Sequence, residues 1–316
     1  MINLFHVNNH TINTVNYNNL LHDTVVTTFE DTIKDYVGAQ YAVTFNSATS
    51  AIFLTLLNKN IVVNVPSMIP PVVLNAIITS NNRYRFIDDV DWVGDSYVLH
   101  DFGDYKIVDS AQKLEKNQFI TECNDDDLMV FSFYPTKPVG SSDGGMIVSN
   151  DFKKIKYLKE LALNGMTSSH NNWERTIKLP GYKMYMNSIQ AEIAMNNFNM
   201  YEEKLSSLKK VRDLYNAELG YSNTSNHLYR IEVIDRDKFI QFMKNNGISC
   251  GIHYSATHLN PVYRNHLNHF AYDENSTNCK LSEEKSESTV SIPFNERLTI
   301  SEVNLIIKKV KEYREK

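Results

Sequence analysis

The chain has 316 residues, of which 42% are hydrophobic and 22% are charged, and its formal net charge at pH 7 is −5. This composition is typical of a soluble globular protein, and the length favours two domains over one. The negative net charge argues against nucleic-acid binding, and every apolar run is far shorter than the ~20 residues that a membrane-spanning helix requires.

The N-terminus and the cysteines predict a cytoplasmic protein. Residues 1–6 contain no basic segment followed by an apolar core, so we expect no signal peptide. The three cysteines, Cys123, Cys250 and Cys279, argue against a disulfide framework and lack the spacing of a zinc site. We therefore expect neither a disulfide framework nor a metal site.

Strand and helix patterns alternate along the first half of the chain. Residues 1–20 are polar and Asn-rich, and they predict an N-terminal arm. Helical patterns follow at 25–36, 51–57, 66–79 and 151–163. Strand patterns lie at 41–45, 61–65, 84–87, 97–100, 106–109, 129–133 and 146–148. This alternation predicts a largely parallel sheet that is covered by helices on both faces.

The second half of the chain predicts a smaller α+β unit. A long amphipathic pattern at 187–214 predicts a helix that bridges two domains. Beyond it we expect strands at 228–233 and 248–254, helices at 236–246 and 301–315, and an exposed polar loop at 271–288. We place a large domain in residues 1–200, with residues 1–20 as its arm, and a small C-terminal domain in residues 201–316.

A lysine between a strand and a glycine-rich turn is the first candidate for chemistry. Lys137 follows the strand pattern at 129–133 and precedes the Gly-Gly pair at 144–145. Burial at such a place lowers the pKa of an ammonium group and frees the amine as a nucleophile. On these residues alone, a surface lysine in a hairpin loop is an equal alternative.

Three further features fit the same chemistry. Residues 46–50 lie at a predicted strand-to-helix junction, where N–H groups and hydroxyls either bind phosphate or simply cap the helix. Asp109 ends a predicted inner strand, at the edge where open parallel sheets bind ligands, although it could equally cap the next element. Ser132 offers a second hydroxyl for the same phosphate. Together with the amine of Lys137, these groups match the requirements of pyridoxal 5'-phosphate.

Motifs along nearly the whole chain resemble those of the DegT/DnrJ/EryC1/StrS sugar-nucleotide aminotransferases, which are fold-type I enzymes of the aspartate-aminotransferase-like group. They are FNSATSAI at 45–52, VPSM at 65–68, VDSAQ at 108–112, SFYPTK at 132–137 with DGG at 143–145, GYKMYMNSIQA at 181–191, and GISCGIHY at 247–254 followed by HLNPVY at 258–263. The resemblance implies an α/β fold with a three-layer α/β/α large domain, a mostly parallel sheet and a smaller C-terminal α+β domain.

The resemblance also implies a role for each matching residue. Lys137 is the implied Schiff-base residue, and lysine rather than histidine at this position favours transamination over 3-dehydration. Asp109 would meet the pyridine nitrogen of the cofactor, and Gln112 would lie near its ring hydroxyl. The other implied contacts are Ser47, Ala48, Thr49, Ser132 and Lys183 of the partner subunit for the cofactor, and His253, Tyr254, His258 and Tyr185 for the substrate.

Four departures from the family pattern stand out. Residues 69–70 (Ile-Pro) occupy the places where an aromatic residue usually stacks on the cofactor ring. Ala48 replaces a glycine of the phosphate turn, which is tolerable at negative φ. Tyr185 stands where Asn or Arg is common, which leaves the phosphate contact across the subunits to Lys183. The crossover helix is reduced to residues 102–105, which predicts a compact version of the fold.

The activity implied by the resemblance is transfer of an amino group to a nucleotide-linked keto-sugar. L-glutamate is the implied donor, a 4-keto-6-deoxyhexose is the preferred acceptor, and a homodimer with shared active sites is the implied assembly. Amination of a 3-keto-sugar is one alternative, and a non-catalytic regulator or sugar-nucleotide-binding protein on the same scaffold is another. We assign Trp92 and Trp173 only to packing.

Overall fold

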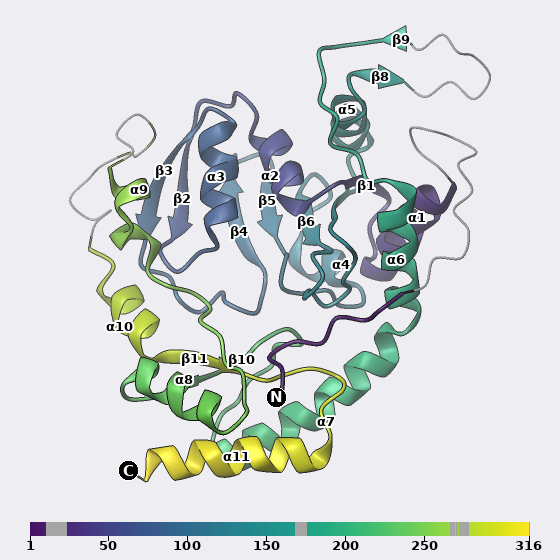
Figure 1. The fold of residues 1–316 in the computed structure, drawn as a ribbon. Helices are drawn as coiled ribbons and strands as arrows, with labels where there is room; N and C mark the ends of the chain where they lie inside the picture. Colours follow the sequence, from purple (N-terminus) through teal and green to yellow (C-terminus); the bar gives the residue numbers. More distant parts are fainter. Residues whose placement is uncertain (11–23, 168–175, 266–268, 270, 272–277, 316) are drawn as a thin grey trace.

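The computed structural model describes residues 1–10, 24–167, 176–265, 269, 271 and 278–315 (Figure 1). In the larger part of the molecule, helices lie against a β-sheet, and a smaller part with α7, α8 and α11 lies below it in this view (Figure 1). Trp173 and residues 11–20 of the predicted arm fall outside the described residues. No helix in the described ranges is long and apolar enough to cross a membrane.

The larger part contains a five-stranded sheet with the strand order β1-β7-β6-β5-β4. Its strands are β1 (Tyr41–Phe45), β4 (Tyr97–Asp101), β5 (Lys106–Asp109), β6 (Leu128–Ser132) and β7 (Gly145–Ser149). A separate parallel pair consists of β2 (Val62–Pro66) and β3 (Arg83–Ile87). The predicted strands agree with these positions to within one residue at each end.

Alternate residues of β6 pack on opposite faces of the sheet, as the two-residue period of a strand requires. Leu128 and Val130 belong to one core and Met129 and Phe131 to another. The first core includes α2 (Ala48–Leu56), α3 (Pro71–Thr79) and α5 (Phe152–Ala162), and the second includes α1 (Thr24–Val37), α4 (Gln118–Glu122) and α6 (Ser188–Asn199). The sheet is therefore covered on both faces, in the predicted three-layer arrangement.

The sheet is mixed rather than mostly parallel, which corrects the prediction. Among the described residues of the five-stranded sheet, β5 and β6 pair in parallel, whereas the pairs β1–β7, β6–β7 and β4–β5 are antiparallel. The reason for the β4–β5 pair lies in residues 102–105, which connect the two strands. A parallel pair needs a crossover of about a dozen residues or more, so this short connection can only form a hairpin.

The helix predicted over residues 187–214 is two helices, α6 and α7 (Tyr201–Leu219), which meet at Met200. A capping box of Asn187 and Gln190 starts α6, and Gly220 in the left-handed region (φ +76°) ends α7. The single helix predicted here is therefore wrong, and the domain boundary at residue 200 stays a prediction.

The smaller part has its own hydrophobic core. This core lies between α7, α8 (Arg236–Asn245), α11 (Ile300–Arg314) and the antiparallel pair of β10 (Tyr229–Glu232) and β11 (Thr289–Ile292). Ile2 joins the core and forms a parallel bridge with Ile248. The first residues of the predicted arm are therefore packed against the smaller part.

Two predictions for the C-terminal region are wrong. Residues 248–254 form isolated bridges at Ile248 and Gly251 instead of a strand. Within the predicted loop 271–288, residues 280–288 form the helix α10 (Lys280–Ser288), and residues 272–277 lie outside the described residues. The remaining short elements are β8 (Met166–Thr167), β9 (Thr176–Ile177), α9 (Pro261–Arg264) and the 3-10 helix η1 (Thr257–Leu259).

Candidate active site

One cavity of about 320 Å³ brings together eight of the twelve site residues that the sequence predicts. It lies at the ends of β5 and β6 and at the start of α2, with Tyr254 from the C-terminal region in its wall. The eight residues are Ser47, Ala48, Thr49, Asp109, Gln112, Ser132, Lys137 and Tyr254. Segments that are up to about 200 residues apart in the chain thus meet at one place, as ligand sites at sheet edges do.

Lys137 lies in the loop between β6 and β7. Backbone hydrogen bonds hold this loop, from Phe133 N to Gly144 O (2.9 Å) and from Ser141 N to Phe133 O (2.8 Å). The surrounding protein removes water from the ammonium group and lowers the pKa of Lys137 to about 8, while the carboxylate of Asp109 opposes this shift. A substantial fraction of the amine is therefore neutral at physiological pH and available as a nucleophile or base.

Asp109 is buried at the end of β5, and two donors hold its carboxylate. Oδ1 accepts a hydrogen bond from Ala111 N (2.9 Å), and Oδ2 accepts one from the hydroxyl of Tyr97 (2.9 Å). Burial raises the pKa of Asp109, whereas these two hydrogen bonds and the charge of Lys137 lower it. The two donors thus oppose the tendency of burial to protonate this carboxylate.

The register of the β4–β5 hairpin places Tyr97 against Asp109. Asp101 pairs with Lys106 next to the turn, and an irregularity between Val98 and His100 shifts the pairing, so that Tyr97 faces Asp109. Without this bulge, the residue opposite Asp109 would be Val98, and a β-bulge commonly re-aims a side chain next to a site in this way. Sequence reasoning missed Tyr97, although the short 102–105 turn indicates the hairpin.

The start of α2 forms one wall of the cavity. Ser47 caps this helix by accepting a hydrogen bond from Ser50 N (3.1 Å), and Thr49 lies in its first turn. Ala48 is not among the residues with positive φ, so the alanine is accommodated without backbone strain. Gly145 lies so close that a Cβ added there would be 2.5 Å from Ala48 N. The N-terminus of a helix with free N–H groups and hydroxyls suits a phosphate group.

Aromatic side chains and Gln112 form another wall. Gln112 accepts a hydrogen bond from Gly94 N (2.8 Å) and donates one to the hydroxyl of Tyr254 (3.1 Å). Trp92 stacks on Tyr254 with ring centroids 6.1 Å apart and an angle of 7° between the planes. Trp92, which we predicted to be only a packing residue, lines the cavity, and so does Pro70.

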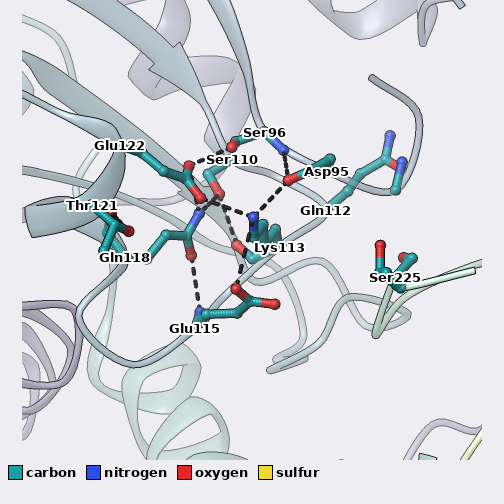
Figure 2. Close-up of polar contacts among 12 residues, drawn as sticks. Asp95, Ser96, Ser110, Gln112, Lys113, Glu115, Gln118, Thr121, Glu122 and Ser225 are labelled. Atoms are coloured by element: carbon teal, nitrogen blue, oxygen red, sulfur yellow. Dashed lines mark hydrogen bonds and ion pairs between the residues drawn. The ribbon is translucent and has the colours of Figure 1, made fainter. Parts of the chain in front are cut away.

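A charged network at the edge of the cavity fixes the segment that follows β5. Figure 2 shows Lys113 between three carboxylates, with Nζ 2.7 Å from Asp95 Oδ1, 2.9 Å from Glu122 Oε1 and 3.7 Å from Glu115 Oε2. These partners raise the pKa of Lys113, which keeps it charged. Because Asp95 also lines the cavity, the network holds the β3–β4 connection against the segment that carries Asp109 and Gln112.

Two of the predicted substrate residues are held away from the cavity lining. His253 Nδ1 contacts Ser291 Oγ (2.9 Å), and burial lowers the pKa of His253 to about 4. His258 is buried between Ser67 Oγ, 2.5 Å from its Nδ1, and Glu283 Oε1, 3.1 Å from its Nε2. His258 thus connects the segment after β2 to α10, and the structure does not bring it to the cavity.

Lys183 and Tyr185 are also absent from the lining of this chain's cavity. Lys183 is exposed and its backbone forms an antiparallel bridge with Leu163. The neighbouring Met184 O accepts a hydrogen bond from Asn46 N (2.8 Å), which ties this segment to the turn before α2. Their expected contacts with the site of a partner subunit stay a prediction.

The residues of the cavity fit pyridoxal phosphate. Three groups are present in one cavity: an amine of lowered pKa, a buried carboxylate held by two donors, and the first turn of a helix with a serine and a threonine. Gly145 supports the third group, because any side chain there would collide with the backbone of this turn. These are the groups that a phosphorylated pyridine aldehyde requires.

Comparison with known proteins agrees with this chemistry. The family model described as the DegT/DnrJ/EryC1/StrS aminotransferase family matches residues 7–92 and 116–311. A UDP-4-amino-4,6-dideoxy-N-acetyl-β-L-altrosamine transaminase from Campylobacter jejuni is 22% identical over 335 residues, which cover 88% of this chain and 86% of that protein.

Solved structures show the same fold. The aminotransferase TlmJ from Streptoalloteichus hindustanus has a TM-score of 0.78 against this chain, at 19% identity and with 99% of both chains covered. A putative sugar aminotransferase from Streptococcus pneumoniae in its PLP form has a TM-score of 0.74 at 20% identity, covering 93% of this chain and 92% of that one. The predicted aspartate-aminotransferase-like α/β class is therefore confirmed.

Proposed function

Because this chain belongs to the DegT/DnrJ/EryC1/StrS aminotransferase family, a family of pyridoxal-phosphate-dependent enzymes, we propose that it aminates a nucleotide-linked keto-sugar. The proposed acceptor is a 4-keto-6-deoxyhexose and the proposed donor is L-glutamate. The product would be an amino-deoxysugar attached to a nucleotide.

The observation that carries this proposal is the meeting of Lys137 and Asp109 in one cavity with the start of α2. When bound, pyridoxal phosphate supplies an electron sink for the negative charge that develops on the carbon next to the transferred nitrogen. Lys137 would hold the cofactor through Nζ. Asp109 would keep the ring nitrogen protonated, and the first turn of α2 would hold the phosphate through Ser47, Ala48 and Thr49, with Ser132 nearby.

Lys137 would also move the proton that the reaction requires. In the cofactor-free protein, burial lowers the pKa of Lys137 to about 8, so an unbound Nζ would be able to take up a proton near neutral pH. An amine whose pKa lies near the working pH is well suited to accept a proton from one carbon and return it to another. Gln112 and Tyr254, which are hydrogen-bonded to each other, would position the ring hydroxyl of the cofactor and the sugar.

Amination at C4 and the dimer are supported by different arguments. The Campylobacter jejuni relative is named for a UDP-linked 4-amino-4,6-dideoxy sugar, which supports the choice of a 4-keto-6-deoxyhexose. Lys183 and Tyr185 lie away from their own cavity, which is compatible with the proposed homodimer in which they complete the partner's site. His253 lies next to Tyr254 and is proposed as a second substrate contact, whereas we do not retain His258.

Spectroscopy and mass spectrometry test the proposal together. The purified protein with pyridoxal phosphate should be yellow, and borohydride should fix the cofactor on the peptide that contains Lys137. Glutamate should shift the spectrum to that of the pyridoxamine form, and a panel of nucleotide keto-sugars should reveal the one that gains an amine. Lys137→Ala should lose the covalent product and all turnover, whereas Lys156→Ala, at an exposed lysine of α5, should lose neither.

A protein that binds the cofactor at Lys137 but is not converted by glutamate would favour the non-catalytic alternative. A protein that shows no absorbance of a protein-bound Schiff base at saturating cofactor would contradict the proposal itself. Amination of a 3-keto-sugar in preference to a 4-keto-sugar would replace the acceptor and leave the rest unchanged.

A further inference from the structure

Arg230 is a largely buried cation on the face of β10 that turns toward the larger part of the molecule. It pairs with Ser291 of β11, and the hydroxyl of Ser291 contacts His253. The guanidinium reaches two backbone carbonyls, His253 O and Val90 O, each at 3.5 Å. Hydrogen bonds of this length are at the weak end of the range for nitrogen and oxygen.

No carboxylate neutralises this cation at close range in the described part of the chain. Among the described residues, no carboxylate lies within 4.0 Å of the Arg230 guanidinium, although Asp91 and Glu232 attract it from farther away. Burial lowers the pKa of Arg230, but an arginine remains charged at any physiological pH. Burying a charge without a partner is costly, so such a group commonly has an anionic partner in the functional state.

Arg230 does not line the cavity, but it contacts two segments that do. One of its acceptors, His253 O, immediately precedes Tyr254, and the other, Val90 O, lies two residues before Trp92; both aromatic residues line the cavity. Burial lowers the pKa of His253, and the positive charges of Lys137 and Arg230 lower it further. Since the pKa of His253 is about 4, the imidazole is neutral at physiological pH and does not compete for an anion.

We propose that Arg230 binds an oxyanion of the substrate at the edge of the cavity that Trp92 and Tyr254 form. This inference rests on the proposed function, because the two substrates of that reaction each carry oxyanions. A guanidinium presents two parallel N–H groups to a carboxylate or to a phosphate equally well. The partner is therefore either the carboxylate of the amino donor or the diphosphate of the nucleotide sugar, and the two half-reactions separate these sources.

The experiment compares the wild-type protein in its cofactor-bound form with Arg230→Gln, Arg230→Lys and Arg236→Gln. Arg236 is a matched control because it belongs to the same smaller part and already has an ion pair with Asp237 (3.0 Å). One arm measures the spectral change on titration with glutamate, which reports donor binding and its limiting rate. The other arm measures calorimetric binding of uridine diphosphate and of thymidine diphosphate, which requires no turnover.

Loss of one hydrogen bond to a charged group corresponds to about 10- to 100-fold in affinity. We expect Arg230→Gln to weaken one of the two arms by this factor, with the limiting rate of the glutamate step nearly unchanged, and Arg236→Gln to weaken neither. Weakening confined to glutamate identifies the carboxylate, and weakening confined to the nucleotides identifies the diphosphate. Arg230→Lys keeps the positive charge but lacks the two parallel N–H groups of the guanidinium. We therefore expect a smaller loss of affinity in the same arm.

Equal affinities of Arg230→Gln and the wild type in both arms would overturn the inference. A loss of affinity in Arg236→Gln as large as that in Arg230→Gln would also overturn it. If Arg230→Gln does not fold, Arg230→Lys carries the same comparison, and wild-type affinity of that variant in both arms overturns the inference. Failure of the wild type to respond to glutamate would refute the proposed transamination, while nucleotide binding by the variants would still decide the role of Arg230.

Discussion

Replacing Tyr97 by phenylalanine removes a single hydroxyl, the one that donates to Asp109 Oδ2 at 2.9 Å. The ring stays, and with it the contact to Trp92 at a centroid distance of 4.6 Å. A hydrogen bond to a charged group contributes about 1.5–3 kcal/mol, which equals about 1–2 units of pKa. We therefore expect Tyr97→Phe to raise the pKa of Asp109 further and to lower the free energy of unfolding by about 1.5–3 kcal/mol where Asp109 is ionised.

The loss should depend on pH with a definite sign. Burial raises the pKa of Asp109 above its unfolded value of 3.8, so the folded state binds this proton more tightly than the unfolded chain. Stability linked to Asp109 is then present below the unfolded pKa and is lost as the pH rises through the folded pKa. Tyr97→Phe increases the difference between the folded and the unfolded pKa of Asp109. The destabilisation caused by Tyr97→Phe should therefore be largest at high pH and should shrink as Asp109 becomes protonated.

Urea denaturation of the cofactor-free protein between about pH 5 and about pH 8 measures this effect. Tyr105→Phe is the control, because Tyr105 lies at the turn of the same hairpin and donates no hydrogen bond from its hydroxyl among the described residues. Weaker cofactor binding in Tyr97→Phe than in Tyr105→Phe would agree with the argument. A pH-independent loss, or equal losses in the two variants, would refute the idea that Tyr97 keeps Asp109 ionised.

Two further predictions concern the cofactor contacts. Gly145→Ala should lower the melting temperature and weaken cofactor binding, since its Cβ would lie 2.5 Å from Ala48 N and overpacking of this kind typically costs about 1–3 kcal/mol. Gly103 has no atom within 4 Å of an added Cβ but has φ +91°, so Gly103→Ala should lower stability through backbone strain and leave cofactor affinity unchanged. An equal loss of cofactor affinity in the two variants would contradict the steric reason. Labelling of the Lys137 amine in the cofactor-free protein, followed by mass spectrometry, should show a midpoint at about pH 8. Asp109→Asn should move this midpoint down, because the carboxylate raises the pKa of Lys137, and a midpoint at the ordinary 10.5 would show that Lys137 is solvated.

Much of the site was predictable because its residues lie in short local patterns. Lys137 sits in a loop between two apolar strands, and residues 46–50 sit between a strand and a helix, so their surroundings follow from their immediate neighbours in the chain. Asp109 at the end of β5 follows from the rule that parallel strands carry ligands at their carboxyl ends. These arguments need no knowledge of contacts between distant residues.

The residues that the sequence missed or misplaced depend on distant contacts. His258 is held by Ser67 and Glu283, from β2's end and from α10, so nothing in its own segment indicates that it is turned away from the cavity. Trp92 lines the cavity because Tyr254, more than 160 residues later, packs against it. Arg230 looks like an ordinary charged residue of a short strand until the structure shows that no carboxylate of the described residues forms an ion pair with it.

Hydrophobic periodicity and turn residues act locally, and they are enough to predict the α/β class, the strand positions, the loop of Lys137 and the helix start that suits a phosphate. The contacts that hold Asp109, in contrast, become visible only in the folded chain. The four-residue connection at 102–105 forces β4 to run antiparallel, and one bulge between Val98 and His100 then places Tyr97 rather than Val98 opposite the carboxylate. A shift of one residue in a strand exchanges the side chains that face a neighbour, and the pattern of apolar residues does not encode that shift here.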